Sequence, residues 1–389
     1  MFDPKVLAAN IKKYRQQNGI KQYTLAQQLL VTPQSVSKWE QGSSVPDLEN
    51  ICRLSEILGV SIDTLLSPAE AAEKLMIAVD GGGTATAFML FTDQGILRQQ
   101  LVLSGSNPNI YGIEKTFEIL KTGIDSLYPR SQALAGIYCG LSGYTAGDNA
   151  PRISEFLQRT YPKTAIKCAG DIFNVAASAD AADKCITVIC GTGSNVSAID
   201  GDTCRRVGGW GYLFSGKGSG FDIGRDAVAA ALAENDGFGQ HTLLTQLVEQ
   251  KLGANIWDSI PRLYAEERSF IAAFSREVFD AYRQADAVAE EILRSNMACL
   301  AEQINFAAKT YDCGNTVILS GGIINPVSVG FLQEYLTPGL QTVVPEMPQM
   351  YGACILGGKA YCRVTDSFRE KLKLAFRNTR KERTENAEN

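Results

Sequence analysis

A glycine-rich turn between two apolar runs is the segment of this sequence best suited to chemistry. It reads Met76-Ile-Ala-Val-Asp80-Gly-Gly-Gly-Thr84-Ala-Thr86, an apolar run followed by a carboxylate, three glycines and two hydroxyl residues. Glycines allow the backbone to approach a ligand closely, and consecutive free N–H groups cradle phosphate oxygens. We predict phosphate contacts from Gly81, Gly82, Gly83, Thr84 and Thr86. Asp80 is the candidate to hold a metal ion through water.

The residues after the glycines indicate which kind of phosphate site this is. A dinucleotide fingerprint opens a helix after its glycines. Here the short apolar run Ala87-Phe-Met-Leu-Phe-Thr92 leads to a turn at Asp93-Gln-Gly95, and Thr86 stands where that fingerprint needs its third glycine. The pattern therefore predicts the tip of a β-hairpin. An ordinary glycine-rich hairpin without a ligand is the alternative.

The same pattern occurs a second time, about a hundred residues later. The apolar run Cys185–Cys190 leads into Gly191-Thr192-Gly193-Ser194-Asn195, and a second apolar run covers Val196–Ile199. Two glycine-and-hydroxyl hairpin tips, one opening each half of a domain, are suited to hold a polyphosphate from opposite sides. The second set of predicted phosphate contacts is Gly191, Thr192, Gly193 and Ser194.

A third glycine-rich segment resembles a P-loop and is rejected. Gly211-Tyr-Leu-Phe-Ser-Gly216-Lys217-Gly218 has glycine where a P-loop needs Ser or Thr on magnesium. Arg205-Arg206-Val-Gly-Gly-Trp210 before it does not read as a buried strand.

Composition limits the remaining possibilities. The 389 residues are 45% hydrophobic and 20% charged, typical of a globular protein with more than one domain. No apolar run is long enough for a membrane span, and the N-terminus does not resemble a signal peptide. The ten cysteines form no CxxC pair, and His241 is the only histidine, which disfavours zinc sites and histidine triads. We expect free thiols in a reducing cytoplasm.

The first 67 residues predict a bundle of short helices. Thr32 before Pro33 is a strong helix start, and Gly42 ends that helix. Val36 and Trp39 share its inner face, so the amide, hydroxyl and amine side chains of the other face point outward. Such groups read base edges and phosphates in a major groove. The predicted DNA contacts are Gln22, Thr32, Gln34, Ser35, Ser37 and Lys38.

This module resembles the Cro/C1-type (XRE) helix-turn-helix family over its whole length. The resemblance runs through Leu25-Ala26, Thr32–Gly42, Pro46–Asn50 and Leu58–Asp63, with Leu30 where the family usually has glycine. It implies binding of a double-stranded DNA operator. Seven basic and six acidic residues leave one net positive charge. Because one copy therefore attracts phosphate weakly, we expect a homodimer on two half-sites. A helical module used only for protein contacts is the alternative.

Residues 75–363 predict an α/β domain in two halves. Three strands and then alternating helices and strands precede Cys185, and long helices occupy about 218–310. This region resembles the actin-like ATPase superfamily, a duplicated ribonuclease H-like fold, specifically the BadF/BadG/BcrA/BcrD and N-acetylglucosamine kinase family. The expected boundaries are a DNA-binding domain at 1–67, a linker at 68–74, subdomain I at 75–184, subdomain II at 185–363 with its last helix returning to subdomain I, and a frayed charged tail at 364–389.

The resemblance implies ATP and Mg²⁺ as cofactors and assigns further residues. Gly321 and Gly322, in Ser320–Ile323, resemble the segment that meets adenosine. Asp171 resembles the family carboxylate near metal and phosphate, so the metal candidates are Asp80 and Asp171. Asn107 and Asn109 match the sugar-contacting asparagine region. Dehydratase activators of the same superfamily need a cysteine pair for an iron–sulfur cluster that is not found here.

The sequence departs from the family where a sugar kinase needs acids. Thr145 follows Gly140-Leu-Ser-Gly143 at the position of the expected general base, so Asp148 is the remaining catalytic candidate. The family segment Gly-Asp-Glu-Gly-Ser reads Gly216-Lys217-Gly218-Ser219 here after Ser215. Lys217 and Ser219 become candidate ligand contacts, with Lys217 either binding an anionic sugar or lying in solvent.

The sequence therefore predicts a DNA-binding transcriptional regulator with a sugar-kinase-like ATPase domain. That domain would sense nucleotide, an amino-sugar-like ligand, or both. The first alternative is an active ATP-dependent N-acetylhexosamine kinase that carries a DNA-binding domain. The second is an ATPase scaffold whose nucleotide state controls a protein partner.

Overall fold

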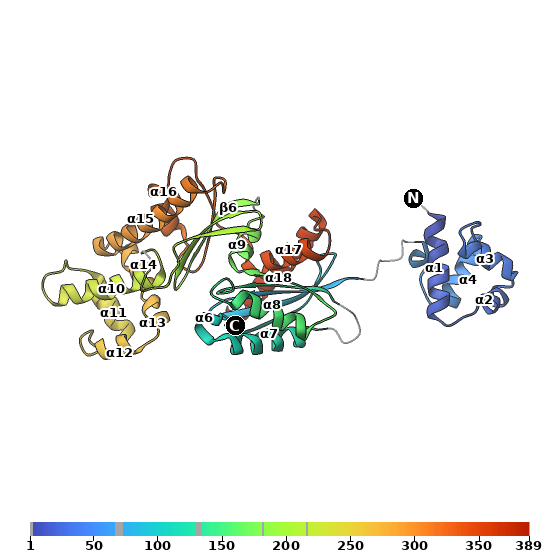
Figure 1. The fold of residues 1–389 in the computed structure, drawn as a ribbon, viewed down its shortest axis with the longest axis horizontal. Helices are drawn as coiled ribbons and strands as arrows, with labels where there is room; N and C mark the ends of the chain where they lie inside the picture. Colours follow the sequence, from blue (N-terminus) through green and yellow to red (C-terminus); the bar gives the residue numbers. More distant parts are fainter. Residues whose placement is uncertain (1–2, 67–72, 129–133, 181–182, 215–216, 389) are drawn as a thin grey trace. The chain divides into compact units, whose positions relative to one another are not determined.

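The computed structural model describes residues 3–66, 73–128, 134–180, 183–214 and 217–388 (Figure 1). The chain divides into two compact units, residues 1–73 and 74–389, which we describe separately. Most of the predicted linker, 68–74, lies outside the described residues. None of the described helices combines the length and the apolarity needed to cross a bilayer.

The first unit is the predicted bundle of short helices. Its elements are α1 (Pro4–Gln17), α2 (Gln22–Leu29), α3 (Pro33–Glu40), α4 (Leu48–Leu58) and α5 (Ile62–Leu66). Their apolar faces meet in one core, in which Leu25, Val36 and Leu54 are fully buried. Thr32 caps α3 as expected, since its hydroxyl accepts a hydrogen bond from the backbone N–H of Ser35 at 3.2 Å.

The turn between α2 and α3 keeps a left-handed residue although glycine is missing. Leu30 has φ 59° and ψ 36°, and its side chain is 82% exposed. A residue other than glycine adopts this conformation at an energetic cost, because its Cβ approaches the following carbonyl oxygen. The helix-turn-helix is thus retained at a local cost in stability.

A buried ion pair connects the helices of this unit. The Arg15 guanidinium donates to both carboxylate oxygens of Glu40, at 2.5 and 3.0 Å, and to the carbonyl oxygen of Ile20. Gln22, predicted to contact DNA, donates its side-chain amide to Glu40 at 2.7 Å. In this structure Gln22 therefore joins α2 to the end of α3.

The second unit contains two five-stranded sheets of the same topology. The first has the order β3-β2-β1-β4-β5 and the second β8-β7-β6-β9-β10, so each has three antiparallel strands followed by two parallel ones. The strands are β1 (Leu75–Gly81), β2 (Ala85–Thr92), β3 (Leu97–Ser104), β4 (Leu134–Leu141), β5 (Ala165–Gly170), β6 (Lys184–Cys190), β7 (Ser194–Asp200), β8 (Thr203–Val207), β9 (Thr316–Ser320) and β10 (Gln341–Val343). This repetition confirms the predicted duplicated α/β fold.

Helices cover both faces of the first sheet. One face packs against α7 (Ile113–Leu127) and α8 (Asn149–Thr160), and short α6 (Pro108–Tyr111) precedes α7. The other face packs against α9 (Ile172–Ser178) and α17 (Gln349–Tyr361). β4 passes close to α9 at Gly140, where a Cβ would lie 2.2 Å from the Asn174 side chain, so glycine is required at this position.

The second sheet packs against a layer of helices that begins with α10 (Gly220–Asn235). The others in this layer are α11 (Leu243–Leu252), α14 (Ser275–Arg283), α15 (Ala287–Thr310) and α16 (Pro326–Tyr335). The short helices α12 (Ile260–Ala265) and α13 (Arg268–Ala273) pack against α10 and α11 in a separate cluster. The 24-residue α15 contributes Leu293, Leu300 and Ile304 to the largest core of the molecule.

The prediction that residues 364–389 form a frayed tail is wrong for the first part of this segment. Residues 366–388 form the helix α18 (Asp366–Glu388; Figure 1). Its Phe368 and Leu372 are buried against the first sheet and α17. The charged composition of the tail hid an apolar residue on each of the first turns of one helix face, at Phe368, Leu372 and Phe376. A Cβ at Gly95 would lie only 2.3 Å from the carbonyl oxygen of Phe368, so the turn after β2 fits closely against this helix.

Candidate functional site

The first glycine-rich tip is a closed hairpin turn. The N–H of Gly82 donates to the carbonyl oxygen of Ala85 at 2.9 Å, and the N–H of Ser106 donates to the carbonyl oxygen of Gly82 at 3.0 Å. A Cβ at Gly81 would lie 2.5 Å from the Leu141 side chain, so this glycine is required for packing. Gly82 and Gly83 are half-buried and Thr84 is exposed, which leaves the tip accessible to a ligand.

Thr86 lies behind the tip and does not face a ligand. Its side chain is fully buried, and its hydroxyl donates to the carbonyl oxygen of Ser104 at 2.9 Å and lies 2.8 Å from Ser106 Oγ. The predicted phosphate contact from Thr86 therefore needs correction, because its buried hydroxyl is already hydrogen-bonded to Ser104 and Ser106. Thr86 holds the hairpin in position.

Asp80 is held by an asparagine from α9. Asn174 Nδ2 donates to Asp80 Oδ1 at 2.7 Å, and Asn174 Oδ1 accepts a hydrogen bond from the Tyr138 hydroxyl at 3.1 Å. Burial raises the pKa of the Asp80 carboxyl to about 6; the Asn174 amide opposes the shift and the charge of Asp171 reinforces it. A cation between the two carboxylates would relieve this repulsion.

Asp171 lies between the phosphate tip and the predicted sugar-contacting region. Burial raises the pKa of its carboxyl, while hydrogen bonds from the Ser142 hydroxyl and the Ile172 N–H, and the charge of Arg206, act in the opposite direction. Asn107 Nδ2 donates to Ser142 Oγ at 3.2 Å. A chain of polar contacts thus connects Asp171 with Asn107.

Three asparagines form one polar group beside Ser142. Asn107 caps α6, since its Oδ1 accepts from the N–H of Asn109 at 2.9 Å. Asn149 Nδ2 donates to Asn109 Oδ1 at 3.2 Å and to the carbonyl oxygen of Gly143 at 3.0 Å. A Cβ at Gly143 would lie 2.4 Å from Asn107 Oδ1, so glycine permits this close approach. The structure therefore brings the predicted Asn107 and Asn109 together.

The second glycine-rich tip sits at the start of α10. The N–H of Gly191 donates to the carbonyl oxygen of Gly193 at 2.9 Å, and the N–H of Gly220 donates to the carbonyl oxygen of Gly191 at 2.8 Å. Thr192 and Gly193 are exposed. The exposed tip lies beside the positive end of a 16-residue helix, an arrangement that favours an anion.

The two halves share a cavity of about 660 Å³. Asp80 from the first half and Ser320 and Gly321 from the second line it, together with residues of β2, β3 and α18. Gly321 has φ 111°, and a Cβ there would lie 2.2 Å from the carbonyl oxygen of Cys190. Glycine is therefore required for the predicted adenosine segment to lie against the end of β6.

The segment that replaces the family acids is occupied by internal contacts. Lys217 Nζ lies 2.9 Å from Asp226 Oδ2, and Asn296 Nδ2 donates to the same oxygen at 3.1 Å. Ser219 is buried and forms a capping box with Asp222 at the start of α10, so its predicted ligand contact needs correction. The position of the first missing acid, Gly216, lies outside the described residues.

Neither Asp148 nor Thr145 is set deep in the site. Asp148 is exposed at the start of α8, with its carboxylate 3.9 Å from Arg152, and Thr145 is exposed in the loop before it. Asp171 is the carboxylate that the structure connects both to the asparagine group and to Asp80.

A family model covers most of this unit. The model of the BadF/BadG/BcrA/BcrD ATPase family matches residues 77–356. The chain belongs to this family. A helix-turn-helix model matches residues 11–65, so an XRE-type helix-turn-helix region precedes the BadF-type domain.

Relatives resemble the two regions separately. An N-acetylmuramic acid/N-acetylglucosamine kinase from Clostridium acetobutylicum is 25% identical over 300 residues, covering 73% of this chain and 98% of that protein. A glucosamine kinase from Vibrio cholerae is 23% identical over 299 residues, 73% of this chain and 95% of that protein. An SPbeta prophage-derived HTH-type transcriptional regulator of Bacillus subtilis is 43% identical over 61 residues, 16% of this chain and 56% of that protein.

A solved structure supports the fold. That of a proposed N-acetylglucosamine kinase from Chromobacterium violaceum aligns with a TM-score of 0.58 and 24% identity. The alignment covers 73% of this chain and 98% of the other.

Sequence reasoning missed three residues of the BadF-type site. Asn174 follows Asp171 by one helical turn, a spacing that places both on one face of α9. Ser142 lies in the Gly-Leu-Ser-Gly turn that was read only for its glycines. Arg206 lies in a segment that does not read as a buried strand, and only the fold places β8 where the charge of Arg206 acts on Asp171.

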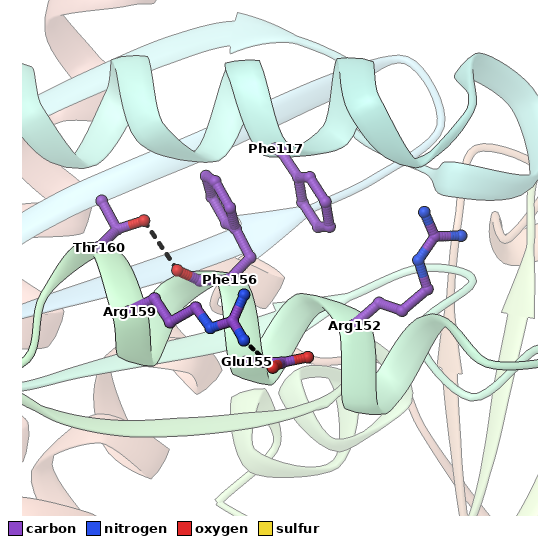
Figure 2. Close-up of a pocket in the computed structure, with 6 residues that line it drawn as sticks. All are labelled: Phe117, Arg152, Glu155, Phe156, Arg159 and Thr160. Atoms are coloured by element: carbon purple, nitrogen blue, oxygen red, sulfur yellow. Dashed lines mark hydrogen bonds and ion pairs between the residues drawn. The ribbon is translucent and has the colours of Figure 1, made fainter.

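A second hollow of about 320 Å³ lies between α7 and α8 and contains none of the predicted site residues (Figure 2). Phe117 and Phe156 stack there with ring centroids 4.2 Å apart. Its arginines are paired, Arg159 with Glu155 at 2.7 Å and Arg152 with Glu114 at 3.5 Å. These contacts account for its polar groups as surface structure of the BadF-type domain.

Proposed function

We propose that this protein is a DNA-binding transcriptional regulator whose BadF-type domain senses nucleotide and an amino-sugar-like ligand. One contrast carries the proposal. Asp80 and Gly321, two of the residues predicted to meet nucleotide, line one cavity from the two halves of the domain. The segment expected to supply acids to a sugar instead contains Lys217 in an ion pair with Asp226. A domain that keeps its ligand site and alters its catalytic acids is suited to sensing.

The exposed face of α3 supports DNA binding. Thr32, Gln34 and Lys38 are exposed while Val36 and Trp39 are buried, so the helix presents polar groups outward. Ser35 and Ser37 are half-buried beside them, and Gln22 supports the helix end through Glu40. The single net positive charge of the module leads us to propose a homodimer on two half-sites.

The carboxylates beside the first tip fit a hard cation. No group of three or more His, Cys, Asp or Glu suited to a metal occurs in the described parts of the chain. Mg²⁺ is commonly held by one or two carboxylates together with phosphate oxygens, which matches Asp80 and Asp171. Such an ion would neutralise charge on a bound triphosphate, while Asn174 orients Asp80.

The alternative is an active N-acetylhexosamine kinase with a DNA-binding domain. Two relatives are described as amino-sugar kinases, and Asp171 lies between the phosphate tip and the asparagine group. If the chain is a kinase, ADP release with N-acetylglucosamine should be lost in Asp171→Asn and retained in Asp148→Asn, because Asp148 is exposed. ADP release from ATP alone would favour the ATPase scaffold.

DNA binding is tested by titrating the chain's own upstream DNA. We expect salt-sensitive binding that weakens about ten- to a hundredfold in Gln34→Ala/Lys38→Ala, since one good base contact contributes about 1–3 kcal/mol. Lys121→Ala, which removes an exposed charge from α7, is the control. No binding by the wild-type chain, with or without ligands, would contradict the proposal.

Ligand binding is tested by a thermal-shift panel. Binding to the folded state raises the melting temperature by mass action, whether or not chemistry follows. We expect Mg²⁺ with ATP to raise it in the wild type and not in Asp80→Ala, and N-acetylglucosamine or its phosphate to raise it further.

A further inference from the structure

The C-terminal helix α18 lies beyond the matched family domain. The family model ends at residue 356, and α18 begins at Asp366. The alignment with the Clostridium acetobutylicum kinase covers 98% of that protein but only 73% of this chain. Neither the sequence motifs nor the proposed function explains why this helix is folded onto the domain.

Two stripes run side by side along α18. Phe368, Leu372 and Phe376 are spaced by one helical turn and form an apolar stripe. Phe368 packs edge-on to Phe91 of β2 with ring centroids 6.2 Å apart, and Phe376 packs edge-on to Tyr351 of α17 at 5.9 Å. The next residue on each turn is basic, which gives the stripe Arg369, Lys373 and Arg377.

The basic stripe contacts two acidic residues that are far apart in the sequence. Arg369 and Lys373 pair with Asp180, the second at 2.8 Å, and Tyr351 donates its hydroxyl to the same carboxylate at 3.2 Å. Arg377 pairs with Glu346 at 3.0 Å. The side chains of the Asp180 cluster are partly exposed, whereas those of the Glu346 pair are more exposed, which makes that pair weaker.

Both acidic residues lie where the chain passes between the two sheets. The chain leaves the first sheet after α9, at residues 179–180, and returns at residues 344–348 between β10 and α17. Asp180 is in the first crossing and Glu346 in the second. Movement of one half of the domain against the other must bend these two crossings, since hinge motions concentrate in a few residues at element ends.

We infer that α18 is a hinge clasp, an added helix that holds both crossings and restrains the relative motion of the two halves. Phe376 and Arg377 also line the 660 Å³ cavity with Asp80 and Gly321, so the clasp extends to the cleft that both halves share. The restraint belongs to the folded chain itself. Its consequence for nucleotide sensing rests on the proposed function.

Hydrogen–deuterium exchange of the full chain without ligand tests the clasp. The variant Arg369→Gln/Lys373→Gln/Arg377→Gln removes the basic stripe and keeps the apolar stripe, so the helix remains docked. We expect exchange to rise about threefold or more at both crossings and at the tips 80–84 and 190–194, because exchange rates follow local opening. Asp180→Asn/Glu346→Gln should reproduce the pattern from the other side of the contacts.

Lys371→Gln is the matched control, since Lys371 is exposed on the same helix. It should exchange like the wild type. Faster exchange confined to α18, or at only one crossing, would overturn the inference, because the clasp requires both.

Addition of Mg²⁺ and the ATP analogue AMPPNP to the wild type should protect the two tips. Absence of that protection would count against the proposed nucleotide site and leave the ligand-free result for the clasp unaffected.

Discussion

Asp80 depends on the side chain of Asn174 for its position. The Asn174 amide connects Asp80 with the Tyr138 hydroxyl, and Asn174 is fully buried. Removal of a buried hydrogen-bonding partner costs about 1–3 kcal/mol at the groups left unpaired. The asparagine therefore holds the carboxylate of Asp80 at the wall of the shared cavity.

Asn174→Ala should weaken binding of Mg²⁺ with AMPPNP by about tenfold, because each 1.4 kcal/mol corresponds to a factor of ten. Isothermal titration calorimetry measures this directly. Asn149→Ala, which removes a buried amide from the asparagine group instead, should leave the nucleotide affinity close to that of the wild type. Equal losses in both variants would indicate general destabilisation.

The raised pKa of Asp80 predicts a pH dependence of stability. Its folded pKa of about 6 lies above the ordinary value of 3.8, so its contribution to stability is present at low pH and is lost as pH rises through 6. Asp80→Asn removes the buried charge and keeps an acceptor for Asn174. Without metal, we expect the variant to melt above the wild type at pH 7.5, with a smaller difference at pH 5. A difference independent of pH would contradict the assignment.

At the scale of elements, the turn before α3 stores strain at Leu30. Left-handed residues with a Cβ cost about 1–2 kcal/mol, and the exposed Leu30 side chain contributes little packing. Leu30→Gly should therefore stabilise the first unit by about 1 kcal/mol, less the backbone entropy that glycine loses on folding. Hydrogen exchange of α2 and α3 in urea measures this. Leu48→Gly, at an exposed helical position, should destabilise the unit, and a loss of stability in both variants would contradict the strain.

Periodicity and turn residues predicted most elements but not the directions of their side chains. The two hairpins follow from apolar runs around glycines, and the start of α3 from Thr32 and Pro33. The hydroxyl motif did not reveal that Thr86 faces inward, because its partners Ser104 and Ser106 lie about twenty residues away in the sequence. The cap formed by Ser219 with Asp222 is local, and it was missed because Ser219 was assigned to ligand from the family resemblance. The fold of α18 was missed because its buried Phe368 and Leu372 lie among charges.

The candidate site was predicted only in outline, because local patterns indicate its residues but not the contacts between them. Strand ends and glycine tips indicated Asp80 and Gly191 from local pattern, and the family resemblance added Gly321. The contacts that connect Asp171 with Ser142, and Asn107 with Ser142, join segments separated by about thirty residues, and only the sheet topology brings these together. The Lys217–Asp226 pair could likewise not be predicted without the position of α10, because Asp226 lies on that helix.

At the scale of the molecule, two sheets of equal topology meet at a shared cavity, and an additional helix holds the two chain crossings between them. An XRE-type helix-turn-helix unit precedes this domain on the same chain. In our account, ligand binding in the BadF-type domain changes the affinity of the first unit for DNA. Such a change requires ligand to bind one state more tightly than the other.

The most direct test is the affinity of the full chain for its upstream DNA, measured by fluorescence anisotropy at fixed salt. The titration is made without ligand and with Mg²⁺, ATP and N-acetylglucosamine, in the wild type and in Asp80→Ala. We predict a change of about fivefold or more in the wild type, the lower end of typical allosteric coupling, and none in the variant. DNA binding that is the same with and without these ligands in the wild type would contradict the account.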